Sequence, residues 1–176
     1  MEYNELDTNI KKSFKLSIRN MVNEILEENE YREVEENVSI VSDTFVVEVV
    51  RGMMDKRSFQ KWGKVNFTIE DNEMKVLVGE IETNMRKKKP SQKQLEYYTS
   101  LLDQLELGEN VTSDYFFFQN NMKRMKEMLE GKTPATEKQK ATIQKLWKKK
   151  FGEELEMNEN ITKKEVTTLF EIVNNI

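Results

Sequence analysis

The sequence predicts an α+β fold, with an N-terminal helix on a 3–4 stranded antiparallel sheet and then a C-terminal all-helical array of two helix-loop-helix repeats. Two observations lead to this prediction. Apolar residues recur every three or four positions before residue 30 and mostly every second position between residues 38 and 78. The rest of the chain contains two similar segments, which open at Pro90 and Pro134. The predicted domains are an α+β module at residues 1–85, helical repeat 1 at residues 86–131 and helical repeat 2 at residues 132–176.

The first predicted element is an amphipathic helix over residues 5–29. Its apolar residues recur at spacings of three and four and predict one buried stripe, made of Leu6, Ile10, Phe14, Ile18, Met21 and Ile25. The helix runs into an acidic block, Glu24 to Glu36, which holds seven glutamates and one arginine. Because negative charge opposes the helix dipole at a C-terminus, we expect this end to fray. The block is otherwise typical of a solvated face.

The predicted sheet follows from alternation of apolar and polar residues. Residues 38–40 predict a short strand, and residues 45–50 predict a strand covered on both faces. Residues 65–69 and 74–78 flank the turn signal Asp71-Asn72 and predict a hairpin. The intervening residues 52–63 are predicted to form a loop or a short helical turn.

Four helices are predicted in the second half, at about residues 91–106, 112–130, 136–151 and 162–174. The residue before a proline resists the α conformation, so each repeat is expected to begin its first helix just after Pro90 or Pro134. Three capping boxes mark helix starts, namely Ser91 with Gln94, Thr136 with Gln139 and Thr162 with Glu165. The second helix of repeat 1 opens with four consecutive aromatics, Tyr115 to Phe118, and its apolar content exceeds what one helix face buries. A partner or dimer contact through the Tyr115–Met128 face is therefore one hypothesis, and core packing is the other.

The repeat resembles a helical unit of small phage and mobile-element accessory proteins of low-GC Gram-positive bacteria. In that unit a Pro-(Ser/Thr)-x-Lys-Gln start precedes a helix, a loop and a second helix that opens (Leu/Ile)-(Thr/Ser)-Lys-x-Glu. Repeat 2 matches in both parts, in Pro134 to Gln139, where Ala135 stands between the proline and Thr136, and in Ile161 to Glu165, whereas repeat 1 matches only in its opening helix. The resemblance covers about residues 86–176 and implies a setting, which includes anti-CRISPR and other anti-defence proteins, rather than an activity.

Composition excludes several kinds of active site. The chain has no cysteine and no histidine, which removes thiol nucleophiles, thiolate metal sites and the commonest general base. No phosphate loop or metal-spacing motif replaces them, so we predict a protein that is not an enzyme and needs no cofactor or metal. The acidic start of the chain and the lack of a long apolar run predict a soluble protein of the host cytoplasm, without membrane contact.

Positive charge is the strongest functional signal. Residues 1–83 carry 11 basic and 18 acidic side chains, and residues 84–176 carry 17 and 14. Lysines at helix surfaces neutralise phosphates without reading base sequence. The predicted nucleic-acid or partner-binding residues are Arg86, Lys87, Lys88, Lys89, Lys93, Lys138, Lys145, Trp147, Lys148, Lys149 and Lys150. Simple solubilisation is the alternative for the lysines, and for Trp147 the alternatives are base stacking and core packing beside Ile143 and Leu146.

Glu80 and Glu82 would share one face of the last predicted strand, as paired carboxylates do in two-metal nucleases. The lysine that such signatures place next is missing, and charges that protect a sheet edge explain the pair equally well. The leading hypothesis is therefore a phage or mobile-element accessory protein that binds nucleic acid or a nucleoprotein complex through its basic repeats, while its acidic N-terminal module contacts a protein. The rival is an anti-CRISPR-like inhibitor that binds a host defence nuclease, in which Glu24 to Glu36 would mimic phosphates.

Overall fold

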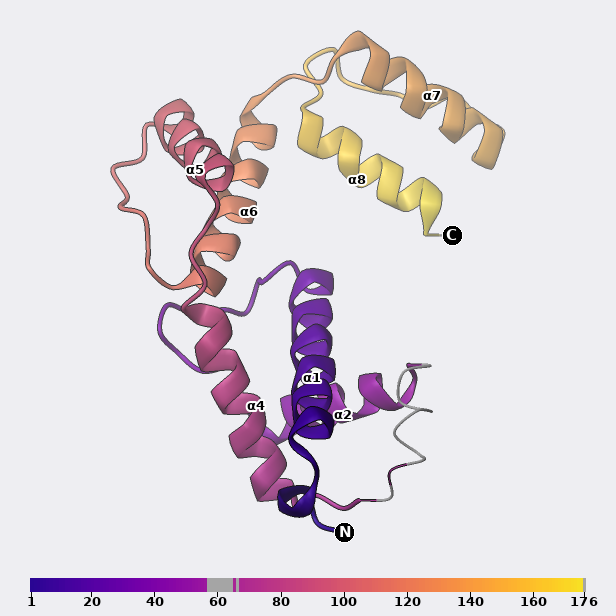
Figure 1. Cartoon of the computed structure of the whole chain (residues 1–176). Helices are drawn as coiled ribbons and strands as arrows, with labels where there is room; N and C mark the ends of the chain where they lie inside the picture. The colour runs from indigo at the N-terminus through magenta and orange to yellow at the C-terminus, as the bar shows by residue number, and fades with distance from the viewer. Residues whose placement is uncertain (57–64, 66, 176) are drawn as a thin grey trace. The chain divides into compact units, whose positions relative to one another are not determined.

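The computed structural model describes residues 1–56, 65 and 67–175 and is helical throughout its regular structure. A 3-10 turn, Tyr3–Glu5, precedes the helices α1 (Thr8–Glu28), α2 (Asp43–Met54), α4 (Asp71–Arg86), α5 (Gln92–Leu105), α6 (Tyr115–Lys132), α7 (Glu137–Phe151) and α8 (Lys163–Asn174), which Figure 1 labels. The chain forms two compact units. Unit 1 consists of Met1–Ser91 and Val111–Asn120, and unit 2 consists of Gln92–Asn110 and Asn121–Ile176.

The predicted sheet is wrong, and so is the α+β class. Residues 45–50 lie in α2 and residues 74–78 lie in α4. In the described part of the chain, strand-like pairing is limited to two isolated bridges, Glu2 with Thr68 and Pro134 with Thr162. Residues 38–40 form no regular element and pair with no strand there. Of the predicted loop at 52–63, residues 52–54 complete α2 and residues 57–63 lie outside the described residues.

Local caps and helical spacing explain why these apolar runs became helices. The Ser42 hydroxyl accepts from the backbone N–H of Phe45 at 3.1 Å and so begins α2. Val46, Val49 and Met53 then face the core at spacings of three and four, while Val47 is 55% exposed. A run in which nearly every residue is apolar satisfies both periods, and packing selects the helical one.

The pattern of α4 likewise fits both a strand and a helix. Asp71, which looked like a turn residue, is the first residue of the helix, and its negative charge interacts favourably with the positive N-terminal end of the helix dipole. The residues that α4 buries also follow the helical period: Met74, Leu77, Val78, Ile81, Glu82 and Met85. Val76 breaks the supposed strand pattern because it is 62% exposed. The alternation of residues 74, 76 and 78 was therefore coincidental.

Unit 1 is a three-helix core in which α1, α2 and α4 pack against one another (Figure 1). Its fully buried side chains include Ile18, Val22, Val49 and Val78, and the start of α6 adds Phe116. The predicted helix at residues 5–29 is present as α1, and Asp7 caps it by accepting from the N–H of Asn9 at 2.7 Å.

In unit 2 the helices agree closely with those predicted from the second half of the sequence. The α7–α8 helix-loop-helix, which we call the hairpin although its two helices run in the same direction, carries both of its predicted capping boxes, Thr136 with Gln139 and Thr162 with Glu165. Backbone hydrogen bonds join the two helix starts, since the N–H of Ala135 donates to the carbonyl of Ile161 at 2.8 Å. The hairpin has a small core of its own, made of Ala135, Ile143, Ile161, Val166 and Val173.

The aromatic start of α6 is used within the chain. Tyr115, Phe116, Phe118 and Met125 are all buried, and Tyr115 and Phe116 belong to the unit 1 core. Packing inside one chain therefore accounts for most of the apolar excess that suggested a dimer contact. Met128, at 37% exposure, is the large apolar residue of α6 that stays most open among those described.

Candidate functional site

Three of the predicted lysines form one exposed row on α7. Lys138, Lys145 and Lys149 are separated by seven and four residues, which places them along one face of a helix. All three are exposed, and none has a hydrogen-bond or ion-pair partner for its ammonium group among residues 1–56, 65 and 67–175. We call these three residues the lysine stripe. Ile143, the fully buried core residue of α7, lies on the other side of the helix.

Two further α7 lysines hold the hairpin together. The ammonium of Lys150 donates to the carbonyl of Val173, near the end of α8, at 2.7 Å. The ammonium of Lys140 donates to the carbonyl of Glu159 at 2.8 Å and pairs with Glu137 at 3.0 Å. A cation at the last carbonyls of a helix also interacts favourably with the negative C-terminal end of the helix dipole. Lys150 was predicted as a binding residue, and the structure gives its ammonium a contact within the hairpin.

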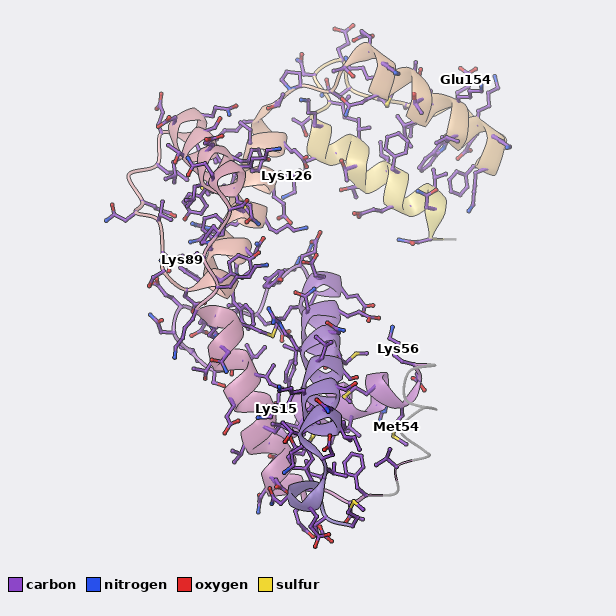
Figure 2. All side chains as sticks on the ribbon, in the orientation of Figure 1. Lys15, Met54, Lys56, Lys89, Lys126 and Glu154 are labelled. Atoms are coloured by element: carbon purple, nitrogen blue, oxygen red, sulfur yellow. The ribbon has the colours of Figure 1, made fainter. Side chains whose placement is uncertain are left out.

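Lys148 and Trp147 belong to neither of these two groups. Lys148 pairs with Glu154 at 2.9 Å, and this contact lowers the pKa of the Glu154 carboxyl; Figure 2 shows Glu154 beside α7. Both partners are largely exposed, so the pair adds little stability. Trp147 is half-buried, packs on the hairpin core and lies 4.5 Å from the Phe151 ring, measured between ring centroids. The indole thus faces about half a turn away from the lysine stripe.

Arg86, predicted as a nucleic-acid contact, is at the centre of a buried ionic network in unit 1. Its side chain is only 12% exposed, and its guanidinium pairs with Glu82 at 2.9 Å and with Asp114 at 2.5 Å. It also donates to the backbone carbonyl of Val38 and lies over the Phe116 ring, 5.0 Å from the centroid. This arginine ties α4 to the segments on either side of it and is not part of an exposed basic surface.

The two carboxylates of the network are fully hydrogen-bonded. Glu82 accepts from the Ser39 hydroxyl at 2.5 Å and from the N–H of Ile40 at 3.0 Å. Asp114 accepts from the N–H of Asn37 at 2.8 Å and from the N–H of Phe116 at 3.0 Å, which also caps α6. Buried charges are tolerated only when they are paired and bonded in this way.

The supposed nuclease pair does not share a face. Two residues apart on a helix, Glu80 and Glu82 point about 200° away from each other. Glu80 is exposed and pairs with Lys15 at 3.5 Å, whereas Glu82 is 2% exposed inside the network. Across the residues that the structure describes, no group of three or more histidine, cysteine, aspartate or glutamate side chains is arranged to hold a metal ion.

The remaining predicted site residues follow α4. Lys87, Lys88 and Lys89 are exposed and belong to unit 1, while Lys93 is exposed on α5 in unit 2; Figure 2 labels Lys89 in the segment after α4. The ammonium of Lys88 lies 4.6 Å from the centroid of the Tyr115 ring, a cation–π contact.

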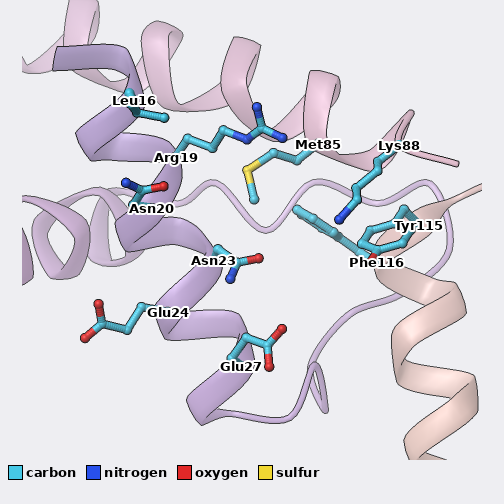
Figure 3. Close-up of a pocket in the computed structure, with 10 residues that line it drawn as sticks. All are labelled: Leu16, Arg19, Asn20, Asn23, Glu24, Glu27, Met85, Lys88, Tyr115 and Phe116. Atoms are coloured by element: carbon cyan, nitrogen blue, oxygen red, sulfur yellow. The ribbon is translucent and has the colours of Figure 1, made fainter. Parts of the chain in front are cut away.

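Lys88 and Tyr115 border a cleft of about 600 Å³ that the sequence did not predict (Figure 3). Its walls come from α1, from the end of α4 and from the start of α6, all within unit 1. The residues that line this α1 cleft are Leu16, Arg19, Asn20, Asn23, Glu24, Glu27, Met85, Lys88, Tyr115 and Phe116. No local pattern indicates this cleft, because the residues of α1 that line it are distant in sequence from Met85 and Phe116.

No family model matches the sequence, and no curated protein or solved structure matches it either. Among the described residues, no helix combines the length and the apolar character that crossing a membrane requires.

Proposed function

We propose that this chain is a non-enzymatic accessory protein of a phage or mobile element, and that it binds nucleic acid or a nucleoprotein complex through the lysine stripe of α7. The observation that supports the proposal is that Lys138, Lys145 and Lys149 share one exposed face without intramolecular partners in the described chain. Such a protein would act in the cytoplasm of the host bacterium.

The chemistry of the stripe favours phosphate contact over base recognition. Lysine ammonium groups are compact, strongly hydrated charges, and they lack the planar donor fork with which arginine recognises base edges. We therefore expect binding with little sequence preference and with strong salt dependence. The slope of the log binding constant against log salt is negative, and each phosphate contact that is lost should make it less steep by about 0.9 on duplex DNA.

The test is an electrophoretic titration of the full chain with DNA and RNA, at about 50 and 200 mM salt. The triple variant Lys138→Glu, Lys145→Glu, Lys149→Glu should lose most of its affinity at the lower salt. Lys140→Gln, whose ammonium is bonded inside the hairpin, is the control for the single variant Lys145→Gln, because each removes one lysine charge from the same helix and only Lys145 belongs to the stripe. Absence of any DNA or RNA complex at low salt, or equal losses in Lys145→Gln and its control, would contradict the proposal.

A second candidate function is inhibition of a host defence nuclease, and a specific observation favours it. The acidic block stays largely on the surface of unit 1, where Glu27, Glu28, Glu33, Glu35 and Glu36 are all exposed. A row of carboxylates can occupy a cationic channel that normally holds nucleic acid. Tagged protein should then retain a defence complex from host lysate after nuclease digestion, whereas a nucleic-acid binder would lose its bound complexes under the same treatment.

A further inference from the structure

We infer that the lysine stripe of α7 binds the phosphate backbone of a nucleic-acid duplex in preference to a single strand. This ligand class rests on the proposed function, because it applies only if the stripe binds nucleic acid. Three features of α7 support it: the short side chains between the lysines, the position of the aromatic residues and the rigid spacing of the row.

The surface between the lysines is low. Ala141 and Thr142 lie three and four residues after Lys138 and four and three residues before Lys145, so both share the face of the stripe. Both are exposed, and the Thr142 hydroxyl donates to the carbonyl of Lys138 at 2.7 Å. A phosphate backbone can therefore approach this face closely, and no bulky side chain stands there to insert between bases.

The aromatic residues of α7 lie on the other side of the helix, where they stabilise the hairpin. Trp147 comes nine residues after Lys138 and two before Lys149, so its indole points about half a turn away from both. It packs on the hairpin core, with its ring centroid 4.5 Å from that of Phe151. Proteins that bind single strands stack bases on aromatic rings, and one stacked base contributes about tenfold in affinity. Along α7, which the structure describes in full, the face of the stripe offers no such ring.

The row is rigid, and a rigid ligand suits it. Lys149 lies eleven residues after Lys138 on one continuous helix, so the row is about 16 Å long. A duplex carries about ten phosphate charges along that length of its axis and holds them in place, whereas a flexible single strand has to be ordered along the row. Each lysine contact also releases more counterions from the duplex, because its charge density is higher. Phosphate contact without stacking therefore favours the duplex.

The experiment is a competition assay with the full-length protein. A complex with a labelled duplex is formed at about 50 mM salt and challenged with unlabelled duplex DNA, duplex RNA and single strands of the same length and sequence. At least one duplex should displace the label at a concentration about tenfold or more below that of the single strands, and the two duplex arms show whether DNA or RNA is bound more tightly. Equal or stronger competition by the single strands would overturn the inference and leave the proposed function intact. Failure to bind any nucleic acid would contradict both.

A gain-of-function variant tests the missing ring directly. Thr142→Trp places an indole on the face of the stripe and should lower the Kd of a single strand about tenfold, the gain expected for one stacked base, without lowering that of the duplex. Gln144→Trp is the matched control, because Gln144 is exposed on α7 but points about 200° away from Thr142. An equal gain in the two variants, or no gain in Thr142→Trp, would show that strands do not lie on this face.

An exposed tyrosine elsewhere in unit 2 gives an independent check. Tyr97 on α5 is 47% exposed and lies one turn after the exposed Lys93, an arrangement that a single-strand contact could use for stacking. If the ligand is a duplex bound by α7, Tyr97→Ala should leave the Kd unchanged, whereas Lys145→Gln should raise it. A larger rise from Tyr97→Ala than from Lys145→Gln would refute duplex binding by the stripe, because stacking would then contribute more than the phosphate contacts.

Discussion

Unit 1 and the α7–α8 hairpin use positive charge in opposite ways. In unit 1 the Arg86 guanidinium is 12% exposed and pairs with two carboxylates that are themselves buried. On α7 the lysine stripe is exposed and has no partner in the described chain, and only Lys140 and Lys150 turn inward to backbone carbonyls. The difference indicates that charge organises the fold of unit 1, whereas half of the six lysines on α7 remain exposed without a partner in the described chain.

The largest expected effect comes from breaking the buried network. Arg86→Ala should destabilise unit 1 by about 3–5 kcal/mol, because it leaves the Glu82 and Asp114 carboxylates buried without their cation. Urea unfolding followed by circular dichroism measures this loss. Glu80→Ala is the control on the same helix, since its exposed pair with Lys15 should contribute less than about 1 kcal/mol. Similar losses in the two variants would show that Arg86 is not the centre of a buried network.

A smaller but more local effect is expected in the hairpin, which buries few residues. Ile143 is fully buried in a core of five residues, and Ile143→Ala should cost about 2–4 kcal/mol. Because so small a core gives the hairpin a low free energy of unfolding, α7 and α8 should lose amide protection while unit 1 keeps it. Hydrogen exchange resolved by residue makes the comparison. If protection fell equally in unit 1, the hairpin would not be an independent unit of stability.

The sequence predicted the hairpin much better than unit 1, and the reason is physical. The starts of α7 and α8 are set by contacts within four residues, namely the boxes Thr136 with Gln139 and Thr162 with Glu165, so the local sequence contains the whole signal. In α2 the run from Phe45 to Val50 fits a strand and a helix alike. Its helical form depends on the Ser42 cap and on packing against α1 and α4, and the packing is not encoded by any local pattern.

The candidate site residues divide in the same way. The lysine stripe could be predicted, because seven- and four-residue spacing on a helix is visible in the sequence. The role of Arg86 could not, since its partner Asp114 is 28 residues away and its partner Glu82 looked like a strand residue. Once α4 is known to be helical, Glu82 and Arg86 are recognisable as an i, i+4 ion pair. The α1 cleft could not be predicted without the fold, because Asn20 and Asn23 line the same cleft as Met85 and Phe116 only after α1, α4 and α6 are in place.

The smallest expected effect separates the starts of α7 and α8 by pH. Both helices start with a capping box, but α7 uses the neutral side chain of Gln139 and α8 uses the carboxylate of Glu165. The N–H and hydroxyl of Thr162 hydrogen-bond to this carboxylate and lower its pKa below the ordinary 4.5. A carboxyl group whose pKa is lowered by folding stabilises the folded state above its unfolded pKa, and this stabilisation disappears as the pH falls through the folded pKa.

Acid should therefore loosen the start of α8 and leave the start of α7 unchanged. The measurement is amide exchange at Thr162 and Thr136, whose N–H groups donate to Glu165 at 2.7 Å and to Gln139 at 2.9 Å. Protection of Thr162 should decline below about pH 4.5, while that of Thr136 should show no such step. Glu165→Gln keeps the capping geometry and should remove the step, and Gln139→Glu should create one at α7. A decline of equal size at both helix starts would mean that another acidic group controls the protection of these amides. The two boxes differ in whether the side chain at the third helical position, Gln139 or Glu165, can titrate.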